Sequence, residues 1–302
     1  MKRLLLIYNA NAGRQKIKTM LPDILDVFAQ EGYLTTVVPT QARGDASRAA
    51  SGLAASFERV VCCGGDGTLN ETVSGLMRVH DTMRPVLGYI PTGTTNDFSH
   101  NLSLPRGTEK LALTACGGVP RAIDLGQAGE NWFTYVAAFG LFTDVSYSTP
   151  QNVKNMLGHT AYLIEGASRL TSVKSYTMRV ECGERVIEDE FIYGMVGNTV
   201  SVGGLLNLSQ ALVKLDDGMF EVLLIRKPKN PLELQSIVHT LVNQKRETEE
   251  QENGLVLGFS ADQIVFTCQE AVPWTLDGEF GGEHKTLRVE NHRQSLVLAC
   301  GK

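Results

Sequence analysis

The sequence predicts two domains, an open parallel α/β sheet followed by a β-sandwich. As far as residue 125, short apolar segments alternate with helical patterns, as in a parallel sheet with helices on both faces. The pattern changes near residue 121, and after a helix predicted at 153–170, period-two strand patterns dominate, which is typical of antiparallel sheets. A chain of 302 residues is long enough to give each domain its own core. We therefore expect domains at 1–125 and 126–302.

The first domain is expected to contain four strands separated by helices. Each strand is a short apolar run without a breaker, and the helices carry apolar residues at helical spacing. The strands cover 4–8, 34–39, 59–63 and 86–90, and the helices cover 17–31, 45–57 and the segment after residue 68. Thr68 and Glu71 match a capping box, which predicts that Thr68 caps the third helix.

Three unusual turns follow strands of this domain, at 9–14, 64–70 and 91–97. In open parallel sheets, ligands bind at the carboxyl ends of the strands. The turn 64–70 is rich in glycine, so its backbone is open to close approach, and the helix after it begins with unpaired N–H groups that favour an anion such as phosphate. The coincidence of three such turns predicts a phosphate-binding crevice at this edge.

Two carboxylates lie in these turns, and a third lies nearby in the sequence. A pair of carboxylates such as Asp66 and Asp97 can hold Mg²⁺ directly or through its waters, and Asp124 could join them. Each has a simpler alternative: an exposed Asp in a tight turn for Asp66, a residue complementing a helix dipole for Asp97, and a structural carboxylate at a domain hinge for Asp124.

The second domain is expected to be rich in β-strands. Alternating patterns predict strands at 176–182, 186–194, 220–225, 263–267, 287–290 and 296–299. Helices are expected at 153–170 and from Pro231, which suits a first helical position. The charged run 245–252 is expected to lie on the solvated surface.

Two turns of the second domain are further candidates. The segment 274–280 predicts a β-hairpin with Glu279 behind its glycine, and a carboxylate there could act as general base if the tip folds over the crevice. The segment 214–220 carries Asp216 and Asp217 beside a glycine, and one side chain with nearby carbonyls could bind a cation. For both, ordinary turn chemistry is the alternative.

The composition of the chain limits which binding partners and which cellular compartment we expect. The net charge of −5 provides no global basic field for nucleic acid or anionic membranes. The six cysteines form no C-x-x-C pair, which favours reduced thiols in a cytoplasmic protein, and adjacent Cys62 and Cys63 should point to opposite faces of their strand. The longest apolar stretch, 132–142, is too short to span a bilayer, so any membrane contact should be peripheral.

These motifs together resemble the diacylglycerol kinase catalytic family, in its soluble bacterial branch. Residues 9–13 resemble the family's N-P-x-x-G, residues 64–71 match G-G-D-G-T-x-N-E, and residues 91–98 match P-x-G-T-x-N-D-F. Further matches follow in the family's order: Gly158, Tyr162, Gly203-Gly204, Asp217-Gly218 and Asp277-Gly278-Glu279. NAD kinases and phosphofructokinases share G-G-D-G alone, so the ordered set is the specific signal.

The resemblance implies ATP- and Mg²⁺-dependent phosphorylation of a lipid hydroxyl, diacylglycerol first among the acceptors, in phospholipid biosynthesis. It implies catalytic roles for Asp66, Asp97 and Asp124, with Glu279 as general base. A second, structural Mg²⁺ would bind the main-chain oxygens of Lys214 and Met219 and the side chain of Asp217. The residues implied at the nucleotide are Asn9, Ala10, Asn11, Ala12, Gly13, Thr40, Gly64, Gly65, Asp66, Gly67, Thr68, Leu69, Asn70 and Thr94.

The resemblance also implies that the last strand, about 291–302, returns to the first domain, and that lipid enters an apolar cleft between the domains. Three positions depart from the family pattern: Ala10 replaces a proline, Ser99-His100 replaces Ala-Arg, and Leu208-Ser209 lacks a proline. Other lipid acceptors (a sphingoid base, another glycerolipid or a prenol), an NAD kinase-like enzyme and a non-catalytic nucleotide- or lipid-binding regulator remain as alternatives. An exposed strand edge could support a homodimer.

Overall fold

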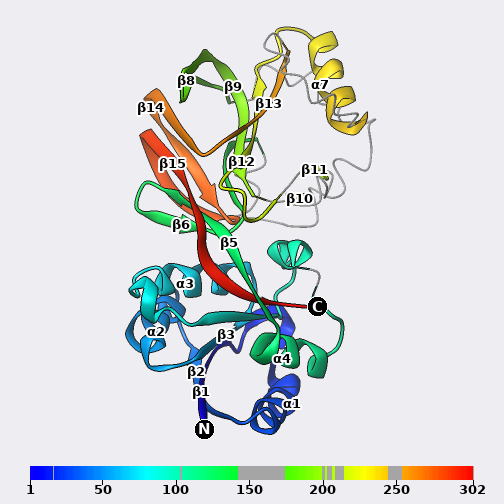
Figure 1. Ribbon diagram of the computed structural model, residues 1–302. Coiled ribbons are helices and arrows are strands. Elements are labelled where there is room, and N and C mark those ends of the chain that lie inside the picture. Colours follow the sequence, from blue (N-terminus) through cyan, green and yellow to red (C-terminus); the bar gives the residue numbers. More distant parts are fainter. Residues whose placement is uncertain are drawn as a thin grey trace. The chain divides into compact units, whose positions relative to one another are not determined.

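The computed structural model describes residues 1–15, 17–102, 104–141, 174–198, 201–202, 206–207, 214–243 and 254–301, and these residues fold into two compact units (Figure 1). The first unit comprises Met1–Leu125, Trp132–Thr134 and Arg293–Lys302. The second unit comprises Gly126–Asn131 and Tyr135–His292. The chain first passes from one unit to the other between Leu125 and Gly126, and the last strand ends in the first unit.

The first unit contains a parallel sheet built on the four expected strands. They are β1 (Lys2–Asn9), β2 (Tyr33–Thr40), β3 (Arg59–Gly64) and β4 (Val86–Pro91), in the order β2-β1-β3-β4. The end of β15 (Glu279–Cys300) extends the sheet by pairing parallel to β4, where Leu298 faces Leu87. The C-terminal strand therefore completes the sheet of the first unit.

Helices cover both faces of this sheet (Figure 1). On one face, α1 (Ile17–Gln30) and α4 (Thr108–Gly117) form a buried cluster with Leu4 and Leu6. On the other, α2 (Asp45–Leu53) and α3 (Asp66–Leu76) pack together and against the strands. Since successive side chains of a strand alternate, Leu5 and Ile7, which are also fully buried, point to the α2/α3 face. The predicted two-sided α/β architecture is confirmed.

Some local predictions for this unit were incomplete. The helix predicted at 45–57 ends at Leu53 and continues as the short 3-10 helix η2 (Ala54–Ser56). The sequence patterns did not reveal α4 or β5 (Val119–Ala128). Three other 3-10 helices cover the turns and connections: η1 (Ala12–Gln15), η3 (Asp81–Met83) and η4 (Asp97–Asn101).

The predicted capping box at Thr68 and Glu71 was wrong. Helix α3 begins at Asp66 with Gly65 as its N-cap, so Thr68 already lies inside the helix. The Thr68 hydroxyl accepts a hydrogen bond from Asn9, and the Glu71 carboxylate accepts from backbone N–H groups at the start of α2. Contacts with other elements therefore replaced the local reciprocal pair that the motif predicts.

The adjacent thiols lie on opposite faces of β3, as predicted. Cys63 belongs to the buried cluster that contains residues of α1 and α4, whereas the Cys62 thiol forms a side-chain hydrogen bond with Thr72 of α3. Both are fully buried, and burial raises the pKa of the Cys62 thiol to about 12. All six cysteines are free, which confirms that they form no disulfide.

The second unit is built from antiparallel strands, as predicted. Its strands form one continuous sheet in the order β13-β12-β9-β7-β14-β15, and β8 pairs with both β9 and β14. Strands β9 and β14 each pair with β7 along one part and with β8 along another, so the sheet folds back on itself. The bounds are β7 (Val136–Gly140), β8 (Tyr176–Cys182), β9 (Arg185–Gly197), β12 (Phe220–Arg226), β13 (Val256–Ala261) and β14 (Gln263–Leu276). The short strand β6 (Asn131–Phe133), which pairs with β5, has its last two residues in the first unit.

Aromatic side chains fill the space inside this folded sheet. Phe139 of β7 and Phe266 of β14 each have their ring centroid 4.9 Å from that of Trp274. The Tyr176 ring of β8 lies 6.0 Å from the Phe139 ring in an edge arrangement. Such pairs contribute to stability beyond the area they bury, so this cluster stabilises the core of the second unit.

Several predicted elements need adjustment or fall outside the described residues. The strands predicted at 287–290 and 296–299 are parts of the single strand β15, and β13 was not predicted. Helix α7 (Pro231–Asn243) begins at Pro231, as predicted, and β10 (Ser201–Val202) pairs with β11 (Leu206–Asn207). Outside the described residues lie the helix predicted at 153–170, the charged run 245–252, Gly158, Tyr162, Gly203-Gly204 and Leu208-Ser209.

Within the described part of the chain, none of the helices combines the length and the hydrophobicity needed to cross a bilayer.

Candidate active site

The parallel register brings the ends of the first four strands to one edge of the sheet. Asn9 pairs with Thr40 at the ends of β1 and β2, and Gly64 pairs with Pro91 at the ends of β3 and β4. The three predicted turns, and the loop after Thr40, therefore start from one line of residues. This is the place where open parallel sheets bind ligands.

The turns approach one another so closely that glycine is required. A Cβ atom on Gly93 would lie 2.5 Å from the Cα of Gly65, which joins the turn after β4 to the turn after β3. A Cβ on Gly13 would lie 1.8 Å from the Thr92 carbonyl oxygen, and Gly13 has a positive φ of 51°. The glycines of all three motifs thus serve one packed cluster of turns.

Asp66 connects two of the turns through its side chain. Its Oδ2 accepts the backbone N–H of Asp97 at 3.1 Å, and its Oδ1 accepts that of Phe98 at 3.3 Å. Asp66 is the first residue of α3, and Asp97 is the first residue of η4. The structure therefore brings together the two carboxylates that the sequence predicts as a pair.

This pair fits the donor set that Mg²⁺ requires. The ion binds oxygen ligands and retains several waters, so it needs only one or two carboxylates. Asp66 and Asp97 are both half-buried, and each oxygen of an ionised carboxylate has further acceptor capacity beside one N–H bond. The arrangement can hold a hydrated Mg²⁺ next to a phosphate.

Asn9 ties the first turn to the same helix. Its Nδ2 donates to the Thr68 hydroxyl at 3.3 Å, and its Oδ1 accepts the backbone N–H of Asn11 at 2.9 Å. Asn70, farther along α3, donates from Nδ2 to the carbonyl oxygen of Trp132 at 3.0 Å. These side-chain hydrogen bonds hold the geometry of the turns.

Burial separates the remaining predicted nucleotide residues into two kinds. Leu69 and Thr40 are buried, so Leu69 can reach a ligand only through its backbone. Thr94 is exposed on the turn after β4, and the residues of the first turn are partly or fully exposed. The half-exposed members are Ala10, Ala12, Gly13, Gly65 and Gly67.

Asp124 occupies a different environment. It lies on β5 with 1% of its surface exposed, and its Oδ1 accepts the backbone N–H of Gln294 at 2.7 Å. Gln294 has a positive φ of 51°, so this carboxylate holds β15 in a backbone conformation that non-glycine residues rarely adopt. The contact is a structural role, and participation of Asp124 in catalysis stays a prediction.

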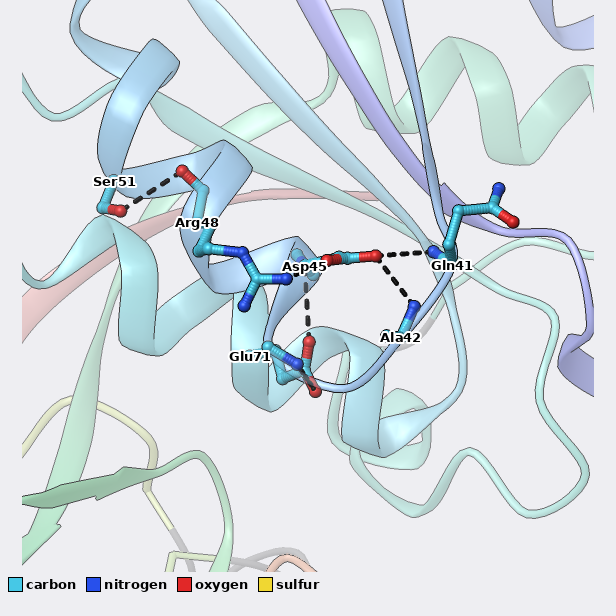
Figure 2. Close-up of polar contacts among 8 residues, drawn as sticks. Gln41, Ala42, Asp45, Arg48, Ser51 and Glu71 are labelled. Carbon is cyan, nitrogen blue, oxygen red and sulfur yellow. Dashed lines mark hydrogen bonds and ion pairs between the residues drawn. The ribbon is translucent and has the colours of Figure 1, made fainter.

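Two further carboxylates hold the loop that follows Thr40, and the sequence patterns did not assign them to the site (Figure 2). Asp45 Oδ2 accepts the N–H groups of Gln41 at 2.7 Å and Ala42 at 2.8 Å. Glu71 of α3 accepts the N–H groups of Gly44 at 2.7 Å and Ala46 at 3.3 Å. Asp45 could have been found from the sequence, because it is an acidic residue in the first turn of a predicted helix. The Glu71 contacts depend on the tertiary structure and have no such sequence signal.

In the second unit, the predicted hairpin at 274–280 is present between β14 and β15. Asp277 is buried at its tip, with a positive φ of 51°, and its Oδ1 accepts the N–H groups of Tyr135 at 2.9 Å and Val136 at 3.1 Å. Glu279, two residues later, is exposed. The tip is thus fastened to β7 by a buried carboxylate that leaves the Glu279 side chain in solvent.

The predicted metal turn contains a tight local contact. Asp217 Oδ1 accepts the N–H of Met219 at 3.0 Å, and Gly218 between them has a positive φ of 84°. Among the residues that the structure describes, no group of three or more His, Cys, Asp or Glu side chains could hold a metal ion. A cation here would rely on the Asp217 carboxylate with the main-chain oxygens of Lys214 and Met219, which are ligands suited to Mg²⁺.

Comparison with known proteins identifies the family. The family model of the diacylglycerol kinase catalytic domain matches residues 3–128. A diacylglycerol kinase of Bacillus subtilis (strain 168) is 36% identical over 284 residues, which span 93% of this chain and 91% of the relative. The chain belongs to the diacylglycerol kinase catalytic family.

Other bacterial relatives and solved structures agree. The diacylglycerol kinases of Staphylococcus carnosus (strain TM300) and Staphylococcus aureus (strain MRSA252) are each 33% identical and span 93% and 96% of this chain, with 90% and 91% of their own lengths covered. A diacylglycerol kinase structure from Bacillus anthracis shares the fold with a TM-score of 0.76 at 22% identity, covering 99% of this chain and 97% of the other.

The stretch matched by the family model includes some of the predicted site residues and leaves others out. The matched stretch 3–128 of this diacylglycerol kinase family member contains all three turns together with Asp66, Asp97 and Asp124. Glu279 and the turn at 214–219 lie beyond it, and the full-length relatives cover them. Of the three departures from the family pattern, the structure describes Ala10 and Ser99, whose hydroxyl donates to the Asn96 carbonyl oxygen at 2.7 Å.

Proposed function

We propose that this family member is an ATP- and Mg²⁺-dependent lipid kinase that transfers the γ-phosphate of ATP to the free hydroxyl of diacylglycerol, giving phosphatidic acid. The observation that carries the proposal is the joining of the turns after β3 and β4 by Asp66, at the strand ends where phosphates bind. The names of the full-length relatives support the choice of a lipid acceptor and of diacylglycerol in particular.

Phosphoryl transfer needs positioning and charge neutralisation more than covalent chemistry. Backbone N–H groups at the start of α3 and in the three turns would orient the phosphates of ATP. Mg²⁺ held by Asp66 and Asp97, directly or through waters, would neutralise their charge. A second Mg²⁺, held by Lys214, Asp217 and Met219, would order the turn before β12.

We assign the general-base role to Glu279. The reaction requires a group that accepts the proton of the attacking hydroxyl, and an exposed carboxylate on a fastened hairpin tip can do this without a change in its own fold. Asp124 would assist from its buried position. The lipid would be met at the membrane surface, through peripheral contact on the cytoplasmic side, and a homodimer would form through an exposed edge strand such as β2 or β13.

The test is phosphate transfer from labelled ATP, with Mg²⁺, to a panel of detergent-dispersed lipids, with NAD as a water-soluble acceptor. We expect diacylglycerol to be labelled and labelling to be lost when Mg²⁺ is chelated. A mock preparation carrying Asp66→Ala serves as the control for contaminating kinases.

Other results would change the assignment in defined ways. Labelling of a sphingoid base, a prenol or another glycerolipid in place of diacylglycerol would keep the mechanism and replace the acceptor. Labelling of NAD would identify an NAD kinase-like enzyme. Binding of ATP with no labelled acceptor across the panel would support a non-catalytic regulator.

A further inference from the structure

Two carboxylates accept backbone N–H groups of the segment 41–46, here called the loop 41–46, which comprises the loop after Thr40 and the first two residues of α2. Asp45 accepts from Gln41 and Ala42, and Glu71 accepts from Gly44 and Ala46, so four backbone N–H groups of this short loop point at side chains of the protein itself (Figure 2). The two backbone bonds lower the pKa of Asp45, and Arg48 forms an ion pair with the same carboxylate. The loop is therefore held in one conformation from both ends.

Glu71 differs from Asp45 because it belongs to another helix. It lies on α3, whose first residue is Asp66 and whose N-cap is Gly65. One rigid helix thus carries the proposed phosphate site at its first turn and a clamp on the loop after Thr40 little more than one turn later. A carboxylate that accepts two N–H bonds makes charge-assisted contacts, which are stronger than neutral ones.

The clamp also determines what this loop can offer to a ligand. The N-terminus of α2 has backbone donors that would otherwise suit an anion, and Glu71 accepts two of the N–H groups there. On the proposed function, phosphates would bind at the start of α3 instead. The loop after Thr40 would then meet the uncharged ribose and base of the nucleotide.

We propose that Glu71 is a positioning residue for the nucleoside part of ATP, and this inference rests on the proposed function. By fixing the loop 41–46 to the helix that begins with Asp66, it sets the distance between the phosphate subsite and the subsite beside Thr40. Loss of the clamp should weaken binding of a whole nucleotide and leave binding of a bare phosphate chain unchanged.

The experiment measures by calorimetry, in the presence of Mg²⁺, how tightly the protein binds two ligands: a non-hydrolysable ATP analogue and inorganic tripolyphosphate. Glu71→Ala removes both acceptor oxygens, and Glu71→Gln keeps one of them together with the size of the side chain. Glu109→Ala is the matched control, because Glu109 is an exposed acidic residue in the first turn of another helix of the same unit, α4.

We expect Glu71→Ala to weaken binding of the ATP analogue about tenfold, because the variant loses the two hydrogen bonds that position the loop. Tripolyphosphate should bind that variant as it binds the wild-type protein. Glu71→Gln should give an intermediate loss for the analogue, and it carries the same test if Glu71→Ala does not fold. Glu109→Ala should match the wild-type protein for both ligands.

Three outcomes would overturn the inference. Unchanged affinity of the analogue in both Glu71 variants would show that the loop does not position the nucleotide. If binding of the analogue and binding of tripolyphosphate were weakened equally, Glu71 would have a general structural role. Failure of the wild-type protein to bind the analogue would remove the proposed function, and the inference with it, whereas the first two outcomes leave the proposed function intact.

Discussion

Asp277 shows how one buried side chain can fix a proposed catalytic residue. Its carboxylate accepts two backbone N–H bonds from the start of β7, and its own N–H donates to the Val136 carbonyl oxygen at 2.8 Å. It also has a left-handed backbone, which Asp and Asn tolerate better than other non-glycine residues. The hairpin that presents Glu279 therefore depends on this residue for its position.

We predict that Asp277→Ala lowers kcat by about 10²-fold, the typical cost of misplacing a reacting group by about 1 Å. Asp277→Asn should keep most of the activity, because its amide oxygen can accept both N–H bonds and asparagine tolerates the same backbone conformation. The KM for ATP should stay near the wild-type value in both. Steady-state kinetics with Glu279→Gln as reference measures this.

Wild-type kcat in Asp277→Ala would contradict the positioning role. An equally large loss in Asp277→Asn would show that the negative charge of Asp277, and not its acceptor geometry, is what the enzyme needs. Normal turnover by Glu279→Gln would remove the general-base role itself.

The buried thiol of Cys62 gives a pH-dependent prediction. Burial raises its pKa from 9.0 to about 12, so the folded state keeps the proton that the unfolded state releases. Stability is therefore lost as pH rises above 9, by about 1 kcal/mol between pH 9 and pH 10 for one such group. Cys62→Ala removes this contribution.

Urea unfolding at pH 9 and pH 10 measures that contribution. The free energy of unfolding of the wild-type protein should fall by about 1 kcal/mol more than that of Cys62→Ala over this interval. Equal losses in the two proteins would mean that the thiol ionises in the folded state as readily as in the unfolded one.

At the scale of elements, the sequence predicted the parallel strands well because each is a short apolar run bounded by turn residues. It missed α4, whose sequence has only a weak amphipathic pattern, and it divided β15 into two strands. Strand β15 is long and irregular: its register against β14 shifts twice, and polar residues interrupt its apolar pattern. Periodicity alone cannot follow a strand through such shifts.

The contact between α2 and α3 gives a prediction in which two effects oppose each other. Gly75→Ala should gain up to about 1 kcal/mol in helix propensity. However, the added Cβ would lie 2.4 Å from the Ser47 carbonyl oxygen and 2.7 Å from the Ala50 Cβ, and overpacking of this kind costs about 1–3 kcal/mol. We expect a net loss of stability.

Gly52→Ala in α2 is the matched control, because nothing lies within 4 Å of its added Cβ. It should stabilise the protein by up to about 1 kcal/mol in denaturant unfolding. If Gly75→Ala stabilised the protein as much as Gly52→Ala does, the close packing of α2 on α3 would be wrong.

At the scale of the whole molecule, the last ten residues of the chain belong to the first unit. Leu298 is fully buried beside β4, Asp124 accepts the N–H of Gln294, and Arg84 donates to the Ser295 carbonyl oxygen at 2.5 Å. The family resemblance predicted this return of the chain, whereas residue patterns alone did not. Such a pairing joins segments too far apart in the sequence for local patterns to show.

A protein that ends at His292 should therefore lose stability in its first unit and bind the ATP analogue weakly or not at all. Limited proteolysis and calorimetry of this truncated protein measure both effects, and removal of Gly301 and Lys302 alone is the control. Unchanged affinity in the protein ending at His292 would show that the first unit does not need its C-terminal strand.

The residues of the candidate site could be predicted from the sequence, but the hydrogen bonds that join them could not. Glycine-rich turns and strand ends in the sequence pointed to Asp66, Asp97 and Glu279. The hydrogen bonds of Asp66 to the turn after β4, of Glu71 to the loop after β2 and of Asp277 to β7 each join residues at least 25 positions apart. Local pattern could not supply these contacts, and in the case of Glu71 it suggested the wrong partner.

The most direct test of the central claim is transfer of labelled γ-phosphate from ATP to diacylglycerol by the wild-type protein and by Asp66→Ala, with circular dichroism to verify the fold of both. We predict transfer by the wild-type protein and a loss of at least about 10²-fold in the folded variant, since a carboxylate that neutralises charge at the phosphates is removed. Wild-type transfer by folded Asp66→Ala would contradict the account.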